Sequence, residues 1–292
     1  MNRRRPSSTS SELPTTLDRW FEIAVRRLAE DLRFGNDASP YVGSGIDYVQ
    51  SRPFVDGDPV RDIDWKRTAR SGRFHVKQYE SLKSTPLYLL VDTSASMTVS
   101  SRRFSKYAMA VLIAGGIGLA ALRRLSPVGI LAAGERALHF QPSLARGRVY
   151  QWLHALRHCR FDETTRLAQR VDQLTAHLRS RSLVVLISDL HDPEAIAAVK
   201  RLAVQHDCAT IQLQDPAERG RLRAGFIRGR EAETSRKFIA HGRVSWFDDR
   251  NSPGQELQQA GIDHLLLSTD QAFVAPLRRF LAARGSLMRN TR

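Results

Sequence analysis

Short apolar runs alternate with longer amphipathic or apolar stretches over most of the chain after residue 85. The candidate strands are 87–91, 128–133, 137–140, 183–188, 209–213 and 264–267. The candidate helices between and after them are 104–124, 147–159, 167–178, 193–206 and 270–283. This alternation predicts an α/β fold, with a doubly wound, mostly parallel sheet and helices on both of its faces.

The first 84 residues follow another pattern. Apolar positions recur at a helical period over 13–34, and Gly35 and Asn36 supply a stop signal. Residues 37–84 are rich in turn residues, with short β-prone pieces between them. The expected organisation is a disordered tail over 1–12, a helix and β-rich extension over 13–84, an α/β domain over 85–285 with an inserted hairpin at 225–247, and a tail over 286–292.

One apolar stretch, Tyr107–Leu122, raises the question of a membrane span. It is shorter than the roughly 20 residues that a span needs, and its glycines suit close packing against a sheet. We therefore expect a buried core helix and no transmembrane segment. No apolar region follows the basic N-terminus as in a secretory signal. Cys159 and Cys208 fit neither a disulfide framework nor a metal spacing, so they read as buried thiols of a cytoplasmic protein.

The chain carries a net charge of +15, and only 6 of its 45 basic residues are lysines. Such a charge suits an anionic partner such as nucleic acid or a lipid surface. Apart from Arg3–Arg5 and the Arg219–Arg230 region, however, the arginines are scattered along the sequence. Scattered charge favours solvated surfaces over a specific nucleic-acid interface, because that interface requires clustering. A basic nucleic-acid-binding protein remains an alternative.

Two aspartates end apolar strand candidates. Asp92 follows LYLLV, with Ser94 and Ser96 after it at steps of two, and Asp189 follows LVVLIS. Ligands of parallel α/β sheets bind at the carboxyl ends of the strands, so these side chains are expected to lie close together. Carboxylate and hydroxyl oxygens suit Mg²⁺ or Mn²⁺. Neutral hydroxyl ligands also leave the cation attractive to an anionic ligand from outside.

The Asp92, Ser94 and Ser96 triplet resembles the DxSxS signature of the metal-ion-dependent adhesion site of von Willebrand factor A domains. That resemblance implies a metal held by Asp92, Ser94, Ser96, Thr165 and Asp189, with Thr164 as the alternative to Thr165. It also implies a binding role, in which an acidic side chain of a partner protein completes the metal's coordination. The residues before the threonine, Glu163 and Thr164, replace the glycines that are usual in the family.

The segment before the first strand of this domain narrows the resemblance. It is similar to the signature of the bacterial family called domain of unknown function 58, through Asp56, Gly57, Asp58, Arg61, Ile63, Asp64, Trp65, Lys66 and Arg70. Members are commonly encoded beside MoxR-type AAA+ ATPases, which implies an adaptor or co-chaperone role. We interpret Ile63 and Trp65 as buried residues that fix the extension. The roles of Asp58, Arg61 and Asp64 stay open.

An enzyme is the main competing hypothesis, with Asp92 as the nucleophile of a metal-dependent phosphotransfer. Phosphatases of the haloacid-dehalogenase type place a second aspartate where this chain has Ser94, whose hydroxyl is no general acid near neutral pH. His191 lies near Asp189, but the sequence supplies no nucleophile, base and orienting group around it. The sequence therefore favours a metal-dependent protein-binding module without catalytic activity.

Overall fold

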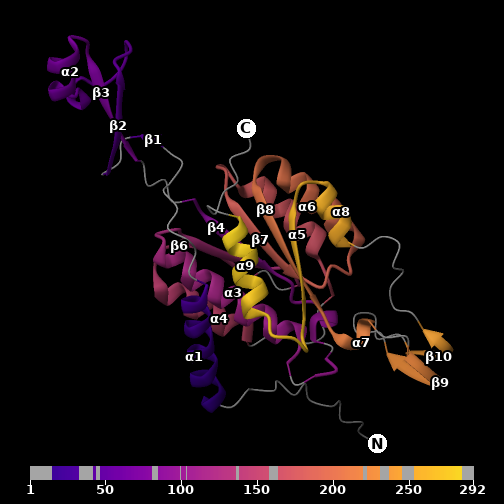
Figure 1. Ribbon diagram of the computed structural model, residues 1–292. Helices are drawn as coiled ribbons and strands as arrows, with labels where there is room; N and C mark the ends of the chain where they lie inside the picture. The colour runs from indigo at the N-terminus through magenta and orange to yellow at the C-terminus, as the bar shows by residue number, and fades with distance from the viewer. Residues whose placement is uncertain are drawn as a thin grey trace, which may run out of the picture. The chain divides into compact units, whose positions relative to one another are not determined.

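The computed structural model in Figure 1 describes the following residues: 15–32, 42–43, 47–80, 85–98, 100–102, 104–135, 138–157, 164–219, 222–230, 237–244 and 253–284. They form two compact units. The first joins the N-terminal helix α1 (Thr15–Asp31) to the chain after residue 85, and the second contains the residues described between 42 and 80.

A six-stranded sheet forms the centre of the first unit, in the order β11-β8-β7-β4-β5-β6. Its strands are β4 (Leu87–Val91), β5 (Val128–Ala132), β6 (His139–Ser143), β7 (Leu183–Ser188), β8 (Asp207–Gln214) and β11 (Asp263–Ser268). Every neighbouring pair is parallel except β5 and β6. This confirms the prediction of a mixed α/β fold with a mostly parallel sheet. The carboxyl ends of its five parallel strands meet at one edge.

Helices cover both faces of this sheet. α5 (Leu167–His177), α6 (Pro193–Gln205) and α8 (Pro253–Gln259) share one buried cluster with Leu90 and Leu186 of the sheet. The opposite face carries α3 (Lys106–Arg123) and α4 (Arg146–Arg157). On that face a Cβ atom added to Gly118 would lie 3.6 Å from Leu89 Cδ1. Leu89 and Leu90 thus serve opposite faces, as neighbours in a strand must.

The apolar helix α3 is a core element. Long and apolar enough to cross a membrane by length and composition alone, it has 78% of its 18-residue window buried within the protein, and buried core helices pass the same test. Helix α1 packs closely on it, because a Cβ atom on Gly116 would approach Leu28 Cδ2 to 2.6 Å. The prediction of a buried helix is confirmed. The close packing of α1 on α3 also places α1 in the first unit, whereas the sequence pattern grouped it with the extension.

The second unit is a small antiparallel sheet with one short helix. The strands β1 (Val42–Gly43), β2 (Asp47–Pro53) and β3 (His75–Glu80) pair in the order β1-β3-β2. A 3₁₀ turn, η1 (Val60–Asp62), and the helix α2 (Trp65–Ser71) lie between β2 and β3. The β-rich character of this segment was predicted, but α2 was not.

Asp64 decides where α2 begins and where its first side chain points. Asp64 caps the helix by accepting a hydrogen bond from the amide of Arg67 at 3.1 Å. Ile63, just before it, bridges to Val76 and is 7% exposed, as predicted. Trp65 is the first helical residue and is 62% exposed, so the prediction that it is buried is wrong. The cap turns the chain, and Trp65 therefore leaves the face that Ile63 occupies.

Smaller differences concern the second half of the chain. The hairpin expected at 225–247 is present as β9 (Leu222–Arg230) paired with β10 (Lys237–Val244), so it begins three residues earlier, and 245–247 lie outside the described residues. The short helices α7 (Pro216–Arg219) and α8 were not predicted. The last helix, α9, spans Val274–Ala283 and begins after the expected residue 270. Cys208 is buried as expected, while Cys159 lies outside the described residues.

Candidate metal-binding site

Asp92 lies at the carboxyl end of β4, directly beside the end of β7. The strands pair in parallel with Val91 opposite Ile187, and the amide of Asp92 continues this ladder to the carbonyl of Ile187 at 2.9 Å. Its carboxylate is 2% exposed. The Ser188 hydroxyl donates to Asp92 Oδ2 at 2.6 Å, and the amide of Ser94 donates to Oδ1 at 2.9 Å. The carboxylate is therefore held in one orientation from two sides.

The two serines of the triplet turn toward the same point. The turn η2 (Ala95–Thr98) follows the strand and brings Ser94 Oγ within 3.0 Å of Ser96 Oγ. Ser94 is 1% exposed, whereas Ser96 is half-buried. The Ser96 hydroxyl also forms a hydrogen bond with the carboxylate of Asp189. The structure thus brings Asp92, Ser94, Ser96 and Asp189 together, as their positions at the strand ends predicted.

A lysine that sequence reasoning did not assign to the site lies beside Asp189. Lys106, at the first turn of α3, is fully buried and places Nζ 2.8 Å from Asp189 Oδ2. The same ammonium contacts Glu218 of α7. The His191 ring lies 3.4 Å from Asp189 Oδ2, and ligand atoms of Asp189, His191 and Glu218 all lie within 4.8 Å of one another. Asp189 therefore interacts both with Ser96 of the triplet and with a second group of side chains, Lys106, His191 and Glu218.

Burial and charge move the two aspartates in opposite directions. Burial, with the nearby negative charge of Asp189, raises the pKa of Asp92 to about 6. The pKa of Asp189 is lowered, because the attraction of Lys106, followed by that of His191, outweighs the effect of its burial. The pKa of Lys106 is raised, since the attraction of Asp189 and Glu218 exceeds its desolvation. Asp92 thus retains a negative charge at neutral pH that no neighbouring side chain balances fully.

The formal charges of this cluster allow a test of whether a divalent cation fits. The carboxylates of Asp92, Asp189 and Glu218 contribute three negative charges, and Lys106 contributes one positive charge. The net formal charge of these four side chains is therefore −2, which a divalent cation would neutralise. Each carboxylate oxygen accepts about two hydrogen bonds or ligand bonds. The Asp92 carboxylate accepts three hydrogen bonds, from the Ser188 hydroxyl and from the amide and hydroxyl of Ser94, so it retains capacity for a ligand bond. The donor set therefore fits Mg²⁺ or Mn²⁺ in charge and in chemistry.

The threonine loop reaches the same edge of the sheet. The amide of Arg166 donates to the carbonyl of Ala133 at 3.1 Å, just beyond β5, and the amide of Ala133 donates to the carbonyl of Val91 at 2.8 Å. This chain of hydrogen bonds ties the loop to the strand that ends in Asp92. Thr164 donates its hydroxyl to Glu135 at 2.7 Å, whereas Thr165 is half-buried next to Arg166. Of the two candidates, Thr164 is thus engaged elsewhere.

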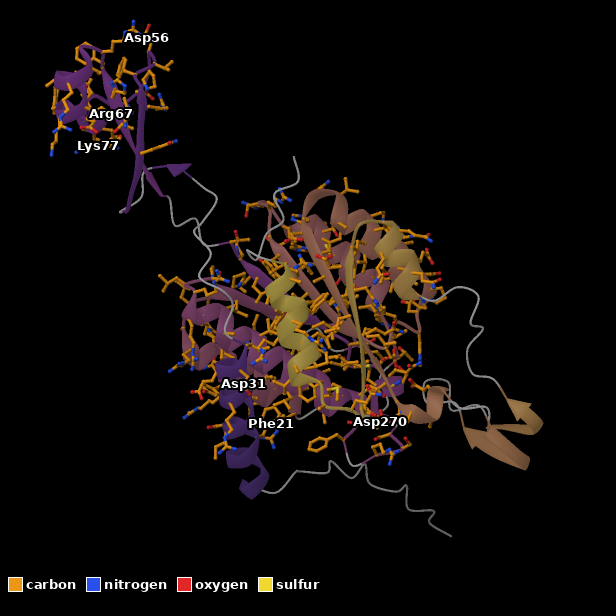
Figure 2. All side chains as sticks on the ribbon, viewed as in Figure 1. Phe21, Asp31, Asp56, Arg67, Lys77 and Asp270 are labelled. Carbon is orange, nitrogen blue, oxygen red and sulfur yellow. The ribbon has the colours of Figure 1, made fainter. Side chains whose placement is uncertain are left out.

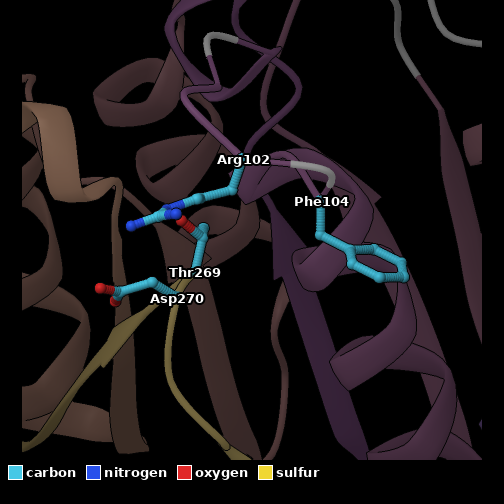
Figure 3. A pocket seen from close by; sticks show the side chains of 4 residues that line it. All are labelled: Arg102, Phe104, Thr269 and Asp270. Atoms are coloured by element: carbon cyan, nitrogen blue, oxygen red, sulfur yellow. The ribbon is translucent and has the colours of Figure 1, made fainter.

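A cavity of about 320 Å³ opens along the same edge, beyond β8 and β11, and is lined by Arg102, Phe104, Thr269 and Asp270. Figure 3 shows the side chain of Arg102 extending over Thr269. Asp215, which follows β8, ties this region together by accepting hydrogen bonds from the amide of Ser101 at 2.9 Å and from the hydroxyl of Thr269 at 3.3 Å. The amide of Asp215 in turn donates to Glu218 at 3.0 Å, so one network joins the cavity to the Lys106 cluster.

Sequence reasoning missed three polar residues of this region: Ser188, Lys106 and Glu218. Ser188 carried a signal, because it directly precedes Asp189 at the end of an otherwise apolar strand. Lys106 carried a weaker one, as the only lysine at the start of a very apolar helix. Glu218 stands in a polar four-residue helix that no periodicity marks, so only the folded chain reveals it.

The geometry defines a mixed α/β protein with a buried acidic and hydroxyl cluster at the carboxyl edge of its sheet. A family model described as "Protein of unknown function DUF58" matches residues 50–243, and the chain belongs to this family. It is similar to uncharacterized proteins of Mycobacterium tuberculosis and Mycobacterium bovis, at 26% identity over 91% of this chain and 88% of theirs.

A solved structure adds a distant similarity. The crystal structure of a conserved hypothetical protein, BatB from Bacteroides thetaiotaomicron, aligns with a TM-score of 0.45 and 14% identity. The alignment covers 68% of this chain and 98% of that one. Neither the family description nor the names of the mycobacterial relatives state a function.

Proposed function

We propose that this protein is a metal-dependent protein-binding module, with a von Willebrand factor A-like, doubly wound domain and a metal-ion-dependent adhesion site. The ligands would be Asp92, Ser94, Ser96, Thr165 and Asp189, and the ion Mg²⁺ or Mn²⁺. The carrying observation is the meeting of Asp92 and Asp189 with two serine hydroxyls at one edge of the sheet. Thr165 is preferred to Thr164, because the Thr164 hydroxyl is already bonded to Glu135.

The donor set explains why such a site would bind a partner. Magnesium prefers six oxygen ligands in near-octahedral geometry. Three of the five candidate side chains are neutral hydroxyls, and Lys106 neutralises part of the charge of Asp189. The ion would therefore keep an attraction for one further anionic oxygen. An Asp or Glu on the partner protein supplies such an oxygen, and the net charge of +15 steers acidic surfaces toward the chain.

Arg102 supports an acidic partner at this edge. It is exposed at the rim of the cavity, and among the described residues its guanidinium has no ion-pair partner. A partner segment that places one carboxylate on the metal ion could place a second carboxylate near Arg102, along the same edge of the sheet. The resemblance to the family's signature segment, Asp56–Arg70, makes a MoxR-type AAA+ ATPase our proposed partner, with this chain as its adaptor or co-chaperone.

Isothermal calorimetry with Mg²⁺ and Mn²⁺ tests the metal site. We expect one divalent ion per chain for the wild type and no measurable binding for Asp92→Ala. Asp172→Ala is the matched control, because Asp172 is a surface acid paired with Arg201 on the helical face of the sheet. Equal heats for wild type and Asp92→Ala would contradict the proposal.

The partner is tested by co-purification with a MoxR-type ATPase, with magnesium or with chelator present. We expect retention that needs both the metal and Asp92. Retention that survives chelation and Asp92→Ala, in a protein that stays folded, would rule out a metal bridge.

A further inference from the structure

Large apolar side chains gather on the surface of the second unit. Among the described residues, nine large hydrophobic side chains are exposed, and four of them lie within residues 47–80. They are Val55 at 62%, Val60 at 66%, Trp65 at 62% and Phe74 at 56% exposure. An exposed apolar cluster on so small a unit is costly in water and marks an interaction surface.

The aromatic members of this cluster touch one another. The Trp65 and Phe74 rings lie 6.4 Å apart edge to face, and the Phe54 and Phe74 rings lie at the same separation. Phe54 and Phe74 are also joined by a backbone hydrogen bond of 2.9 Å. Val55 follows Phe54 directly, and η1, which begins with Val60, packs on β3. We call Phe54, Val55, Val60, Trp65 and Phe74 the aromatic surface.

A rigid polar frame holds these side chains outward. The Ser51 hydroxyl donates to Asp64 at 2.6 Å, and the amide of Asp64 donates to the carbonyl of His75 at 2.8 Å. Arg52 binds both oxygens of Asp58, at 2.7 and 2.6 Å, and so fixes the turn that carries Val55. These polar groups are thus bonded within the unit, while the side chains of Trp65 and Phe74 are exposed. Packing within the unit therefore does not account for the exposure of Trp65 and Phe74.

Exposed cations neighbour the aromatic residues in the sequence. Lys66, Arg67 and Arg70 follow Trp65 in α2, and Arg73 precedes Phe74; all four are exposed. Among the described residues none of the four forms an ion pair. Figure 2 shows the exposed Asp56, on the turn between β2 and η1, apart from Arg67. The segment that carries Trp65 and leads to Phe74 therefore has a net positive charge.

From this juxtaposition we infer that the aromatic surface is a docking site for a protein segment that combines apolar side chains with Asp or Glu. Its cations call for an acidic occupant, and the chain itself, at +15, is a poor one. A nucleic acid is disfavoured because the aromatic rings pack edge to face with one another and do not form a row of open stacking platforms. This site uses none of the residues of the proposed metal site, and the inference does not rest on the proposed function.

The test begins with peptides selected from a displayed random library on the full chain, with counter-selection on the double variant Trp65→Ser/Phe74→Ser. We expect enrichment of sequences that contain both apolar and acidic residues. A synthetic peptide from this set should bind the wild type and lose at least tenfold in affinity with Trp65→Ser and with Arg70→Glu. Chelation should leave its affinity unchanged, which separates this proposal from that of the metal site.

Matched controls exist on the other unit. Val204→Ser changes an apolar side chain that is 83% exposed on α6, and Arg179→Glu reverses an exposed charge before β7. Neither should alter peptide affinity. Four results would overturn the inference: no enrichment over the double variant, equal binding by Trp65→Ser, selected peptides without acidic residues, or a Trp65 that acrylamide cannot quench in the free chain. A Trp65-dependent affinity for oligo(dT) or phosphatidylserine vesicles that exceeds the affinity for peptide would also overturn it.

Discussion

The ammonium of Lys106 lies 2.8 Å from Asp189 Oδ2, with both side chains excluded from solvent. The two residues are 83 positions apart in the sequence. A second carboxylate, that of Glu218, contacts the same ammonium. Lys106 is therefore the internal counter-ion of the acidic cluster, and it offsets one of the cluster's negative charges.

Lys106→Met should lower the free energy of unfolding of the metal-free protein and raise its affinity for a divalent cation. Breaking a buried ion pair by removing one partner costs about 3–5 kcal/mol, because the remaining charge is left buried. The cluster would then carry one more negative charge, so the added stability from Mg²⁺ should exceed that of the wild type. Thermal melting with and without Mg²⁺ measures both effects.

The control for this variant is Lys200→Met, which removes a surface pair with Glu256. Surface pairs contribute about 0–1 kcal/mol, so its melting curves should stay near those of the wild type. If Mg²⁺ stabilises the wild type and Lys106→Met equally, Lys106 does not regulate the site. If Mg²⁺ stabilises neither protein, the metal site itself is absent.

Ser188→Ala should reduce metal affinity although Ser188 is not a proposed ligand. Its hydroxyl orients the Asp92 carboxylate through a 2.6 Å hydrogen bond, and removing such a supporting group typically costs about 10- to 100-fold in metal affinity. Ser182→Ala is the control, because Ser182 is equally buried but donates to the carbonyl of Ser180, just before β7. Calorimetric titration measures the metal affinity of both variants. Equal metal affinities of Ser188→Ala and Ser182→Ala would count against a role for Asp92 as a ligand.

Metal binding should weaken on acidification because Asp92 takes up a proton. Its pKa is raised to about 6 by burial and by Asp189, so protonation competes with the metal below that pH. In the metal-free protein, the raised pKa means that the stability contributed by protonated Asp92 is present below about pH 4 and is lost as pH rises through about 6. Mg²⁺ should restore stability above that range.

Calorimetry at about pH 6, in buffers of different ionisation enthalpy, should show that a fraction of a proton is released for each metal bound. Metal affinity that is constant between about pH 5 and 8 would argue that the carboxylate of Asp92 is not a ligand. Asp92→Asn, which cannot be protonated in this range, should show neither the pH dependence nor the proton release.

The meeting of Asp92 and Asp189 could be predicted because parallel strands align their carboxyl ends. Each aspartate follows an apolar strand, and the register of Val91 with Ile187 places Asp92 opposite Ser188, one residue before Asp189. Lys106 could not be predicted in the same way. The position of the Lys106 ammonium depends on how α3 packs against the sheet. Helical periodicity does not predict which residue a side chain at the first turn contacts.

The extension shows a second limit of sequence reasoning. A large aromatic residue is most often buried, which led to the expectation for Trp65. The helix α2 is only seven residues long, too short to show a periodic pattern, and it begins with Trp65 because Asp64 caps it. The same polar motif that fixes the local fold thus exposes the aromatic side chain. A statistical preference for burial fails where a local cap fixes the direction of a side chain.

The packing of α1 on α3 gives a final prediction, which concerns stability. A Cβ atom on Gly116 would lie 2.6 Å from two side-chain carbons of Leu28, which is 3% exposed. Gly116→Ala must therefore push α1 away from α3 or force Leu28 from its rotamer, and overpacking of this kind costs about 1–3 kcal/mol. Gly147→Ala is the matched control, since its added Cβ would meet no atom within 4 Å and alanine favours a helix such as α4 by up to about 1 kcal/mol. Urea denaturation should show a loss of unfolding free energy for the first variant and none for the second, and an equal or greater stability of Gly116→Ala would mean that α1 does not pack on α3 at this point.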